Sequence, residues 1–360
     1  MEEKYMLRAI ALAKKGKGKV NPNPLVGAVI VKDGKIIGEG YHAKYGDLHA
    51  ERHAFANTTQ DTKGAEMYVT LEPCCHYGKQ PPCTQAIIEH GIQKVYIGSD
   101  DPNALVAGKG ISILREAGIE VETHVLKEEC DALNPVFFHY ITHKTPYVVM
   151  KYAMTADGKI ACDNGESKWI TGTEARQRVQ ETRNELTGIM AGIQTVLQDN
   201  PNLTCRLPEG RNPVRIICDS HLRMPLDSNI VRTAKEIPVI VATISDDAEK
   251  QEALCQAGVE IVRVKEKDGK VDLQDLMIHL GERKIDGILL EGGGTLNQSA
   301  LAAGIVNHIQ VYIAPKIFGG NGKYTPVSGI SVENPSQAYK LANQTIQTIG
   351  SDILIEYDVI

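Results

Sequence analysis

The chain has 360 residues, which predicts two domains at roughly 150 residues each. Apolar residues make up 42% and charged residues 23%, as in an ordinary globular protein, and no apolar run approaches the ~18–20 residues of a membrane span. The net charge of −6 argues against binding to duplex nucleic acid, which usually requires a basic face. The acidic N-terminus lacks the cleavage-site pattern of a secretory signal, so we expect a cytoplasmic protein.

The cysteines are unevenly distributed. Eight Cys in 360 residues are too sparse for a disulfide scaffold. Three of them, however, lie close together at Cys74, Cys75 and Cys83. In a cytoplasmic protein, clustered Cys residues more often bind a metal or act in catalysis than form disulfides.

The segment up to about residue 144 alternates helix and strand patterns, which predicts a layered α/β domain. Asp33-Gly34 is a strong hairpin signal between strands expected at 27–31 and 35–39. The further elements expected are helices at 7–15, 49–56, 84–90 and 110–117 and strands at 67–71, 94–98 and 119–125. A charged stretch with Asn134-Pro135 follows, and we place the domain boundary near residue 144.

The second segment, residues 145–360, again predicts an α/β domain. A helix is expected at 174–186, with Thr171 or Thr173 as a possible N-cap. The other expected elements are helices at 273–282 and 296–303 and strands at 147–154, 188–191, 214–218, 239–243, 260–264, 287–290, 310–314 and 353–359. Neither segment is basic, since the first has 17 Lys and Arg against 18 Asp and Glu and the second has 22 against 27.

His49-Ala50-Glu51 and the two cysteines Cys74 and Cys83 form a candidate zinc site. One imidazole and two thiolates leave a fourth position open for water, which is the catalytic rather than the structural arrangement. Zinc lowers the pKa of such a water to roughly 7. Glu51, two residues after His49, is placed beside the metal to transfer protons.

Other readings of these residues stay open at this point. The set is also compatible with a structural zinc knuckle, in which Glu51 has no role. Cys75 competes with Cys74 as a ligand, and we choose Cys74 because it directly follows Pro73. His53 lies one helical turn after His49 and is a rival ligand, although helix packing is its more common role.

The order H-x-E followed by P-C and a second Cys is the signature of zinc-dependent base deaminases, which usually separate the cysteines by two residues. Here eight residues intervene. This insertion resembles the deaminase domain of the bifunctional riboflavin-biosynthesis deaminase/reductase. The resemblance rests on four blocks, namely Asn21–Gly27, Gly40–His42, Pro73–Cys83 and Asp101–Gly110. Position 75 is usually Ser in that family, so Cys75 departs from its pattern.

The resemblance implies a cytidine-deaminase-like fold for residues 1–144 and hydrolytic removal of the 2-amino group from a diaminopyrimidinone that carries ribosylamine 5′-phosphate. In that family reading, Glu51 is catalytic, His49, Cys74 and Cys83 hold zinc, and Asn23 binds the pyrimidine. The residues that would bind ribose and phosphate are His42, His76, Lys79 and Asn103. Lys79 also makes sense chemically, because a phosphorylated substrate needs a cation.

In the second segment, Glu291-Gly292-Gly293-Gly294-Thr295-Leu296 follows a predicted strand and precedes a helix. Such a turn lets phosphate oxygens approach backbone N–H groups, although a lone glycine triplet is equally common as a plain turn. With Lys151, Asp157–Ala161, Ser167–Thr171, Gly192–Pro201, Leu203–Arg206 and Ala314–Lys316, it resembles the reductase domain of the same bifunctional family.

The reductase resemblance implies a dihydrofolate-reductase-like α/β fold for residues 145–360 and hydride transfer from NADPH to C1 of the ring-opened ribose. By position, the NADPH site would comprise Ala153, Trp169, Thr195, Asp199, Ser220, Gly293, Gly294, Thr295 and Leu296. The substrate site would comprise Ser167, Arg183, Leu203, Arg206 and Glu291. A guanidinium presents a bidentate fork to phosphate, which suits Arg183 and Arg206. Lys151 has no assigned role.

The alternative function is a tRNA adenosine deaminase with an accessory domain, which shares His49, Glu51 and the cysteines. It predicts two residues between the cysteines and a basic RNA-binding face, and the sequence has neither. We therefore expect small phosphorylated pyrimidines as substrates, Zn²⁺ and NADPH as cofactors, no nucleic-acid or membrane partner, and a homo-oligomer.

Overall fold

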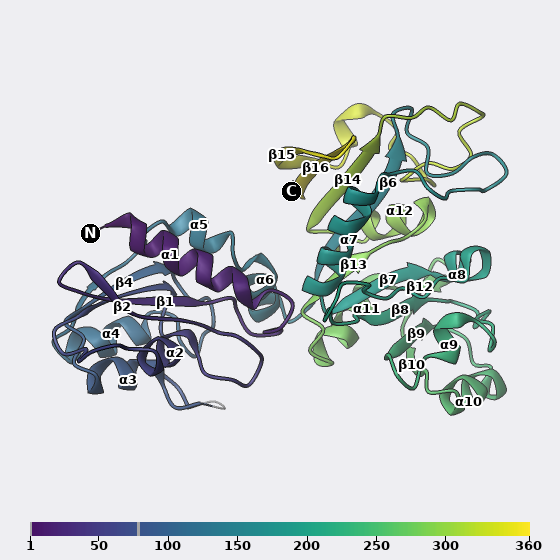
Figure 1. The fold of residues 1–360 in the computed structure, drawn as a ribbon. Coiled ribbons are helices and arrows are strands. Elements are labelled where there is room, and N and C mark those ends of the chain that lie inside the picture. The colour runs from purple at the N-terminus through teal and green to yellow at the C-terminus, as the bar shows by residue number, and fades with distance from the viewer. Residues whose placement is uncertain (1, 78–79) are drawn as a thin grey trace. The chain divides into compact units, whose positions relative to one another are not determined.

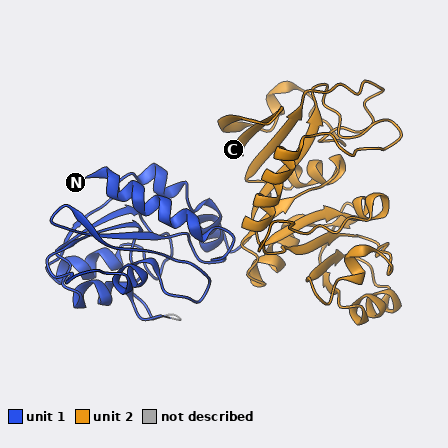
Figure 2. Ribbon diagram, in the orientation of Figure 1, with its two compact units in different colours: residues 1–144 blue, residues 145–360 orange. Residues whose placement is uncertain are grey.

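The computed structural model describes residues 2–77 and 80–360, and the chain divides into two compact units, residues 1–144 and 145–360 (Figure 2). Each unit has its own main sheet and its own hydrophobic cores. None of the helices in the described residues is long and apolar enough to cross a membrane. The α/β architecture predicted for both segments is confirmed.

The first unit is built on a sheet with strand order β2-β1-β3-β4-β5 (Figure 1). The strands are β1 (Gly27–Lys32), β2 (Lys35–Tyr41), β3 (Glu66–Leu71), β4 (Lys94–Ser99) and β5 (Glu120–Glu122). β1 is antiparallel to β2 and β3, whereas β3, β4 and β5 run parallel. Asp33 and Gly34 both have positive φ, as a two-residue hairpin turn of this kind requires, so the predicted hairpin is confirmed.

Helices cover both faces of this sheet. Val29 and Val31 of β1 pack with α1 (Glu3–Ala13) and α5 (Lys127–Asp131), whereas Ala28 and Ile30 face the other core. That second core is completed by α2 (Ala50–Ala56), α3 (Cys83–Glu89) and α4 (Lys109–Glu116). The alternation of side chains along the strand therefore produces three layers, helix, sheet and helix.

A glycine sets the position of α2. A Cβ at Gly40 would lie 2.2 Å from the backbone nitrogen of Ala54, so only glycine lets α2 approach β2 this closely. The region that we treated as a charged boundary contains regular structure, namely α5 and α6 (Pro135–His143). Pro135 stands at the first position of α6, where a missing N–H costs no hydrogen bond, so Asn134-Pro135 marks a helix start.

The second unit has a nine-stranded sheet with order β10-β9-β8-β7-β13-β6-β14-β16-β15 (Figure 1). Its strands are β6 (Tyr147–Thr155), β7 (Gly188–Gly192), β8 (Val214–Cys218), β9 (Val239–Thr243), β10 (Glu260–Arg263), β13 (Gly287–Leu290), β14 (His308–Ala314), β15 (Leu341–Ile349) and β16 (Asp352–Val359). In this order, every neighbouring pair from β10 through β14 is parallel. β16 is antiparallel to both of its neighbours, β14 and β15. A separate small hairpin pairs β11 (Glu266–Lys267) with β12 (Lys270–Val271).

Two sets of helices enclose the parallel part of the sheet. One core contains α11 (Leu273–Glu282) and α12 (Gly294–Ala302), and the opposite core contains α8 (Ile193–Asp199), α9 (Asn229–Arg232) and α10 (Ala248–Gln256). The remaining helix, α7 (Thr173–Glu185), packs on β14 and β16. The predicted threonine N-cap of α7 is wrong. Gly172 is the N-cap residue, and its N–H donates to the carboxylate of Asp352.

Candidate functional site

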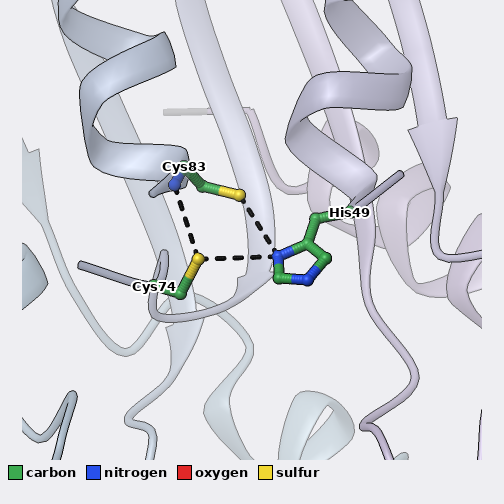
Figure 3. A group of neighbouring side chains, drawn as sticks. All are labelled: His49, Cys74 and Cys83. Atoms are coloured by element: carbon green, nitrogen blue, oxygen red, sulfur yellow. Dashed lines mark hydrogen bonds between the residues drawn. The ribbon is translucent and has the colours of Figure 1, made fainter. Parts of the chain in front are cut away.

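In the first unit, the structure brings together His49, Cys74 and Cys83 (Figure 3). His49 is the N-cap residue of α2, Cys74 lies in the loop after β3, and Cys83 begins α3. The Nδ1 atom of His49 lies 3.5 Å from the Sγ atom of Cys74 and 3.4 Å from that of Cys83. The nitrogen and both sulfurs lie within 4.8 Å of one another.

The donor set fits zinc in both chemistry and spacing. Zn–N bonds of roughly 2.0–2.1 Å and Zn–S bonds of roughly 2.3 Å, at tetrahedral angles, place N and S about 3.5 Å apart. The Nδ1–Sγ distances of 3.4 and 3.5 Å match that separation. Hydrogen bonds from Cys83 and His49 lower the pKa of the Cys74 thiol to about 4, which favours the thiolate that a metal requires.

The two rival ligands lie elsewhere. The thiol of Cys75 points to the carbonyl oxygen of Leu105, 3.5 Å away. Nδ1 of His53 lies 2.8 Å from the carbonyl oxygen of Tyr41, a contact that fixes the ring against β2. Neither side chain belongs to the His49 cluster found among the described residues.

Glu51 lies in the first turn of α2 and is 4% exposed, with its side chain lining a cavity beside the three ligands. Burial and the neighbouring Cys74 raise the pKa of its carboxyl group. A carboxyl group whose pKa is moved toward neutrality can accept a proton and release it again. A structural zinc knuckle has no need for such a buried acid.

The cavity has a volume of about 310 Å³, and the predicted substrate residues Asn23, His42, His76 and Asn103 line it. Nδ1 of His42 lies 3.0 Å from the carbonyl oxygen of Leu48 and therefore donates to it, while Nε2 accepts from Asn23 Nδ2 at 3.1 Å. Burial lowers the pKa of His42, so this ring is neutral. The amide oxygen of Asn23 is then available to accept from a ligand.

His76 offers an unused polar atom to a ligand in this cavity. Its Nδ1 is buried and has no hydrogen-bond partner among the described residues. Such an orphaned atom indicates a missing partner. Lys79, the predicted phosphate cation, lies outside the described residues.

Glu72 holds the loop that carries Asn103. Its buried carboxylate accepts from the N–H groups of Gly108 at 3.0 Å and Ile111 at 3.3 Å. Asp101 accepts from the N–H of Asn103 at 2.8 Å, and burial raises the pKa of Asp101 to about 6. The Glu72 bonds tie the loop to the segment that bears Cys74, and the Asp101 bond fixes the turn within the loop.

Sequence reasoning missed one wall of the cavity, which consists of Phe137, Tyr140 and Ile141 on α6. Their i, i+3, i+4 spacing is the signal that a helix presents one apolar face. We overlooked it because the surrounding charges suggested a boundary.

The second unit contains a larger cavity of about 760 Å³. It lies where the parallel strands end, which is where open α/β sheets bind ligands. The predicted residues that line it are Ala153, Ser167, Trp169, Arg183, Thr195, Asp199, Arg206, Ser220, Glu291, Gly293, Gly294, Thr295 and Leu296. Leu203 does not line it, because its side chain packs into the core beside β7 and β8.

Glu291, directly after β13, is the centre of a charged group in this cavity. Its carboxylate lies 2.7 Å from Nε of Arg183 and 3.8 Å from Nζ of Lys151. Burial alone would raise the pKa of Glu291, but Arg183 and Lys151 outweigh it and lower that pKa to about 2. Burial lowers the pKa of Lys151. Arg183 is thus already paired with a carboxylate in this structure.

The glycine turn after β13 faces the cavity. A Cβ at Gly294 would lie 2.5 Å from the backbone oxygen of Thr325, so this residue must be glycine for the turn to pack. A Cβ at Gly293 would meet no atom within 4 Å, so the backbone here is open to a ligand. Backbone N–H groups at the start of α12 suit a phosphate group, as a dinucleotide requires.

Comparisons with known proteins agree over the whole chain. Residues 1–99 match the cytidine and deoxycytidylate deaminase zinc-binding region, and residues 146–355 match the RibD C-terminal domain. The riboflavin biosynthesis protein RibD of Actinobacillus pleuropneumoniae is 58% identical over 356 residues, which cover 99% of this chain and 95% of that protein. The RibD protein of Bacillus amyloliquefaciens is 41% identical over 354 residues, or 98% of this chain and 95% of its own length.

Solved structures give the same result. A diaminohydroxyphosphoribosylaminopyrimidine deaminase/5-amino-6-(5-phosphoribosylamino)uracil reductase from Thermotoga maritima superposes with a TM-score of 0.88 at 42% identity, over 99% of this chain and 98% of that one. Acinetobacter baumannii RibD has a TM-score of 0.89 at 35% identity, with the same coverage. The chain belongs to the RibD family, the zinc-dependent deaminases and NADPH-dependent reductases of riboflavin biosynthesis.

Proposed function

We propose that residues 1–144 deaminate 2,5-diamino-6-ribosylamino-4(3H)-pyrimidinone 5′-phosphate and that residues 145–360 then reduce the ribosyl group of 5-amino-6-(5-phosphoribosylamino)uracil with NADPH. The observation that carries the proposal is the triangle of His49, Cys74 and Cys83 beside the buried acid Glu51. The Thermotoga maritima relative is a deaminase/reductase with this same pair of activities. The tRNA adenosine deaminase alternative is not favoured, because the matches extend over both units.

In the deaminase step, His49, Cys74 and Cys83 would hold zinc, which when bound activates a water molecule at neutral pH. As the water oxygen bonds to the ring carbon and the bond from that carbon to the amino group breaks, Glu51 would carry one water proton to the ring nitrogen and the other to the amino group, which leaves as ammonia. The amide oxygen of Asn23 accepts a hydrogen bond from the pyrimidine. The residues proposed to hold ribose and phosphate are His42, His76, Lys79 and Asn103.

In the reductase step, NADPH when bound would supply a hydride to C1 of the open-chain ribose, and a proton from solvent would complete the reduction. The turn from Gly293 to Leu296 would bind its phosphates, and the other residues proposed for the cofactor are Ala153, Trp169, Thr195, Asp199 and Ser220. The residues proposed for the substrate are Ser167, Arg183, Leu203, Arg206 and Glu291. Among them Leu203 can act only through its backbone, because its side chain belongs to the core.

The test of this assignment is Glu51→Gln in the full-length protein. We expect zinc content to stay at the wild-type level, ammonia release to fall by roughly 10²–10⁴-fold, and NADPH oxidation with the pre-made aminouracil substrate to stay unchanged. Loss of both activities would contradict the assignment of one reaction to each unit. No ammonia release from the wild-type protein would contradict the deaminase proposal itself.

A homo-oligomer also remains our proposal. β15 forms an edge of the nine-stranded sheet, and the side chains of Leu341 and Ile346 on it are 42% and 63% exposed. A long edge strand with exposed apolar side chains can pair with another chain. Light scattering after size exclusion measures the mass directly, and a monomer at micromolar concentration would contradict the proposal. The cytoplasmic location stays a prediction.

A further inference from the structure

Exposed lysines gather beside the smaller cavity, the one that contains Glu51. Four of them lie in the segment between α1 and Asn23, and a fifth lies between β2 and α2. All five side chains are exposed. We call these five residues the lysine rim, namely Lys14, Lys15, Lys17, Lys19 and Lys44.

Backbone contacts hold both lysine-bearing segments against the wall of the cavity. The N–H of Tyr45, which lines the cavity, donates to the carbonyl oxygen of Lys19 at 3.0 Å. A Cβ at Gly16 would lie 2.6 Å from the carbonyl oxygen of His42, another lining residue, so the first segment packs directly on the wall. The rim charges therefore lie within about one Debye length, ~8–10 Å, of residues that line the cavity.

The cavity itself offers acids rather than basic side chains to a ligand. Within the described part of the chain, neither Lys nor Arg lines it. The acidic residues that line it are Asp47, Glu51, Glu72 and Asp101. The thiolates of Cys74 and Cys83 would offset the two charges of a bound zinc ion. A phosphorylated pyrimidine must therefore approach a cavity whose lining does not attract anions.

Positive charge is concentrated at the lysine rim and not spread over the unit. Residues 14–24 and 41–48 contain five lysines against one acid, Asp47, whereas the rest of residues 1–144 contains 12 Lys and Arg against 17 Asp and Glu. Glu39 acts on Lys15 through space, but its carboxylate already accepts from Arg8 at 2.7 Å. The rim is thus a local positive surface on an otherwise acidic unit.

We propose that the lysine rim attracts the phosphate dianion of the pyrimidine substrate and guides it into the deaminase cavity. Charges of one sign beside a cleft raise the local concentration of an oppositely charged ligand and its association rate by roughly 10–10³-fold. The rim acts on the approach of the substrate, whereas His76 and Lys79 are proposed for the bound phosphate. The inference rests on the proposed deaminase function.

The test reverses two rim charges in the full-length, zinc-loaded protein, as Lys19→Glu/Lys44→Glu. We expect kcat/KM for ammonia release to fall roughly tenfold or more at about 10 mM salt and less than about twofold at about 500 mM salt, because salt screens exposed charges. The kcat should stay within about twofold of wild type, since neither side chain reaches the reacting atoms. Lys19→Gln/Lys44→Gln removes half as much charge and should lower kcat/KM roughly threefold at the lower salt concentration.

Lys35→Glu/Lys63→Glu is the matched control, because it changes the net charge by the same amount. Both lysines are exposed, and they lie at the start of β2 and just before β3. The cavity lies at the other ends of these strands, where His42 and Leu71 line it. The control should therefore keep kcat/KM within about twofold of wild type at both salt concentrations. Zinc content and circular dichroism report whether each variant is folded.

The dephosphorylated substrate separates attraction of the phosphate from a structural effect. Its kcat/KM should be the same in wild type and Lys19→Glu/Lys44→Glu, and the salt series alone decides if this compound reacts too slowly to measure. An unchanged kcat/KM for the phosphorylated substrate at low salt, a loss that persists at high salt, or an equal loss in the control would each overturn the inference. If the wild-type protein releases no ammonia at all, the proposed deaminase function fails instead.

Discussion

Glu291→Gln tests whether the charged group in the second unit is held together as the structure indicates. In the folded protein, Arg183 and Lys151 lower the pKa of Glu291 to about 2, against an ordinary value of 4.5. At 1.36 kcal/mol for each pKa unit, the interaction contributes about 3 kcal/mol to the free energy of unfolding at neutral pH. Removal of one partner from a fully buried pair typically costs about 3–5 kcal/mol, and this pair, with side chains 11% and 15% exposed, falls at the lower end of that range.

The stabilisation that the Glu291 carboxylate provides depends on pH in one direction. Because the folded-state pKa is depressed, the stabilisation is fully present above pH 4.5 and is lost as the pH falls through about 2. The stability difference between wild type and Glu291→Gln should therefore be constant from pH 6 to 8 and narrow below about pH 5. Loss of the carboxylate also leaves Lys151, whose side chain is only 15% exposed, without its counter-charge, so Lys151→Met in the same protein should recover part of the stability.

Urea unfolding can be followed by far-UV circular dichroism alongside the fluorescence of Trp169, the single Trp, which lies in the second unit and is 60% exposed. Glu266→Gln is the matched control, since Glu266 is exposed on the β11–β12 hairpin and its change should stay within about 0.5 kcal/mol. A loss below about 1 kcal/mol for Glu291→Gln, or full additivity with Lys151→Met, would refute the reasoning.

Three further predictions concern separate parts of the molecule. Cys83→Ser should remove zinc, measured by elemental analysis, whereas Cys75→Ser should retain it, because Cys75 lies outside the cluster. Glu72→Gln should loosen the loop that carries Asn103, because the Glu72 carboxylate holds that loop. We expect the deaminase KM to rise and the free energy of unfolding to fall by about 1–2 kcal/mol, while the reductase kcat stays unchanged. An equal effect on both reactions would contradict this reasoning. Despite burial, hydrogen bonds to Glu356 and Asp358 raise the pKa of His308. The stabilisation that the protonated ring contributes is therefore complete below pH 6.5 and is lost as the pH rises through the folded-state pKa. The Tm of His308→Gln should approach that of wild type at high pH, and Tm profiles that stay parallel at all pH values would contradict this prediction.

The fold was predictable where local chemistry decides it. Asp33-Gly34 forms its hairpin because both residues tolerate positive φ, whatever surrounds them. The helices between residues 127 and 144 were missed because their charges resemble a linker, and only the tertiary structure shows that Phe137 faces a cavity. β15 was missed because its side chains are mostly exposed and therefore lack the alternation that indicates a half-buried strand.

The candidate sites were predictable only through motif order. His49, Glu51 and the cysteines lie far apart in sequence, and their convergence depends on how β3, α2 and α3 pack. The lining of the large cavity shows the limit of such reasoning, because Val271 belongs to no motif. Its N–H donates to Oγ of Ser220 at 3.2 Å, a contact that only the folded chain reveals.

The strand order of the second unit has a consequence for synthesis. Of the strands in this sheet, β6 leaves the ribosome first. Its two neighbours in the sheet, β13 and β14, are more than 130 residues further along the chain. Contacts between strands that are so far apart in the sequence form slowly, and an unpaired apolar strand is prone to aggregate before they form. Residues 1–144 pair their strands locally by comparison, so they can fold while the ribosome is still translating the second unit.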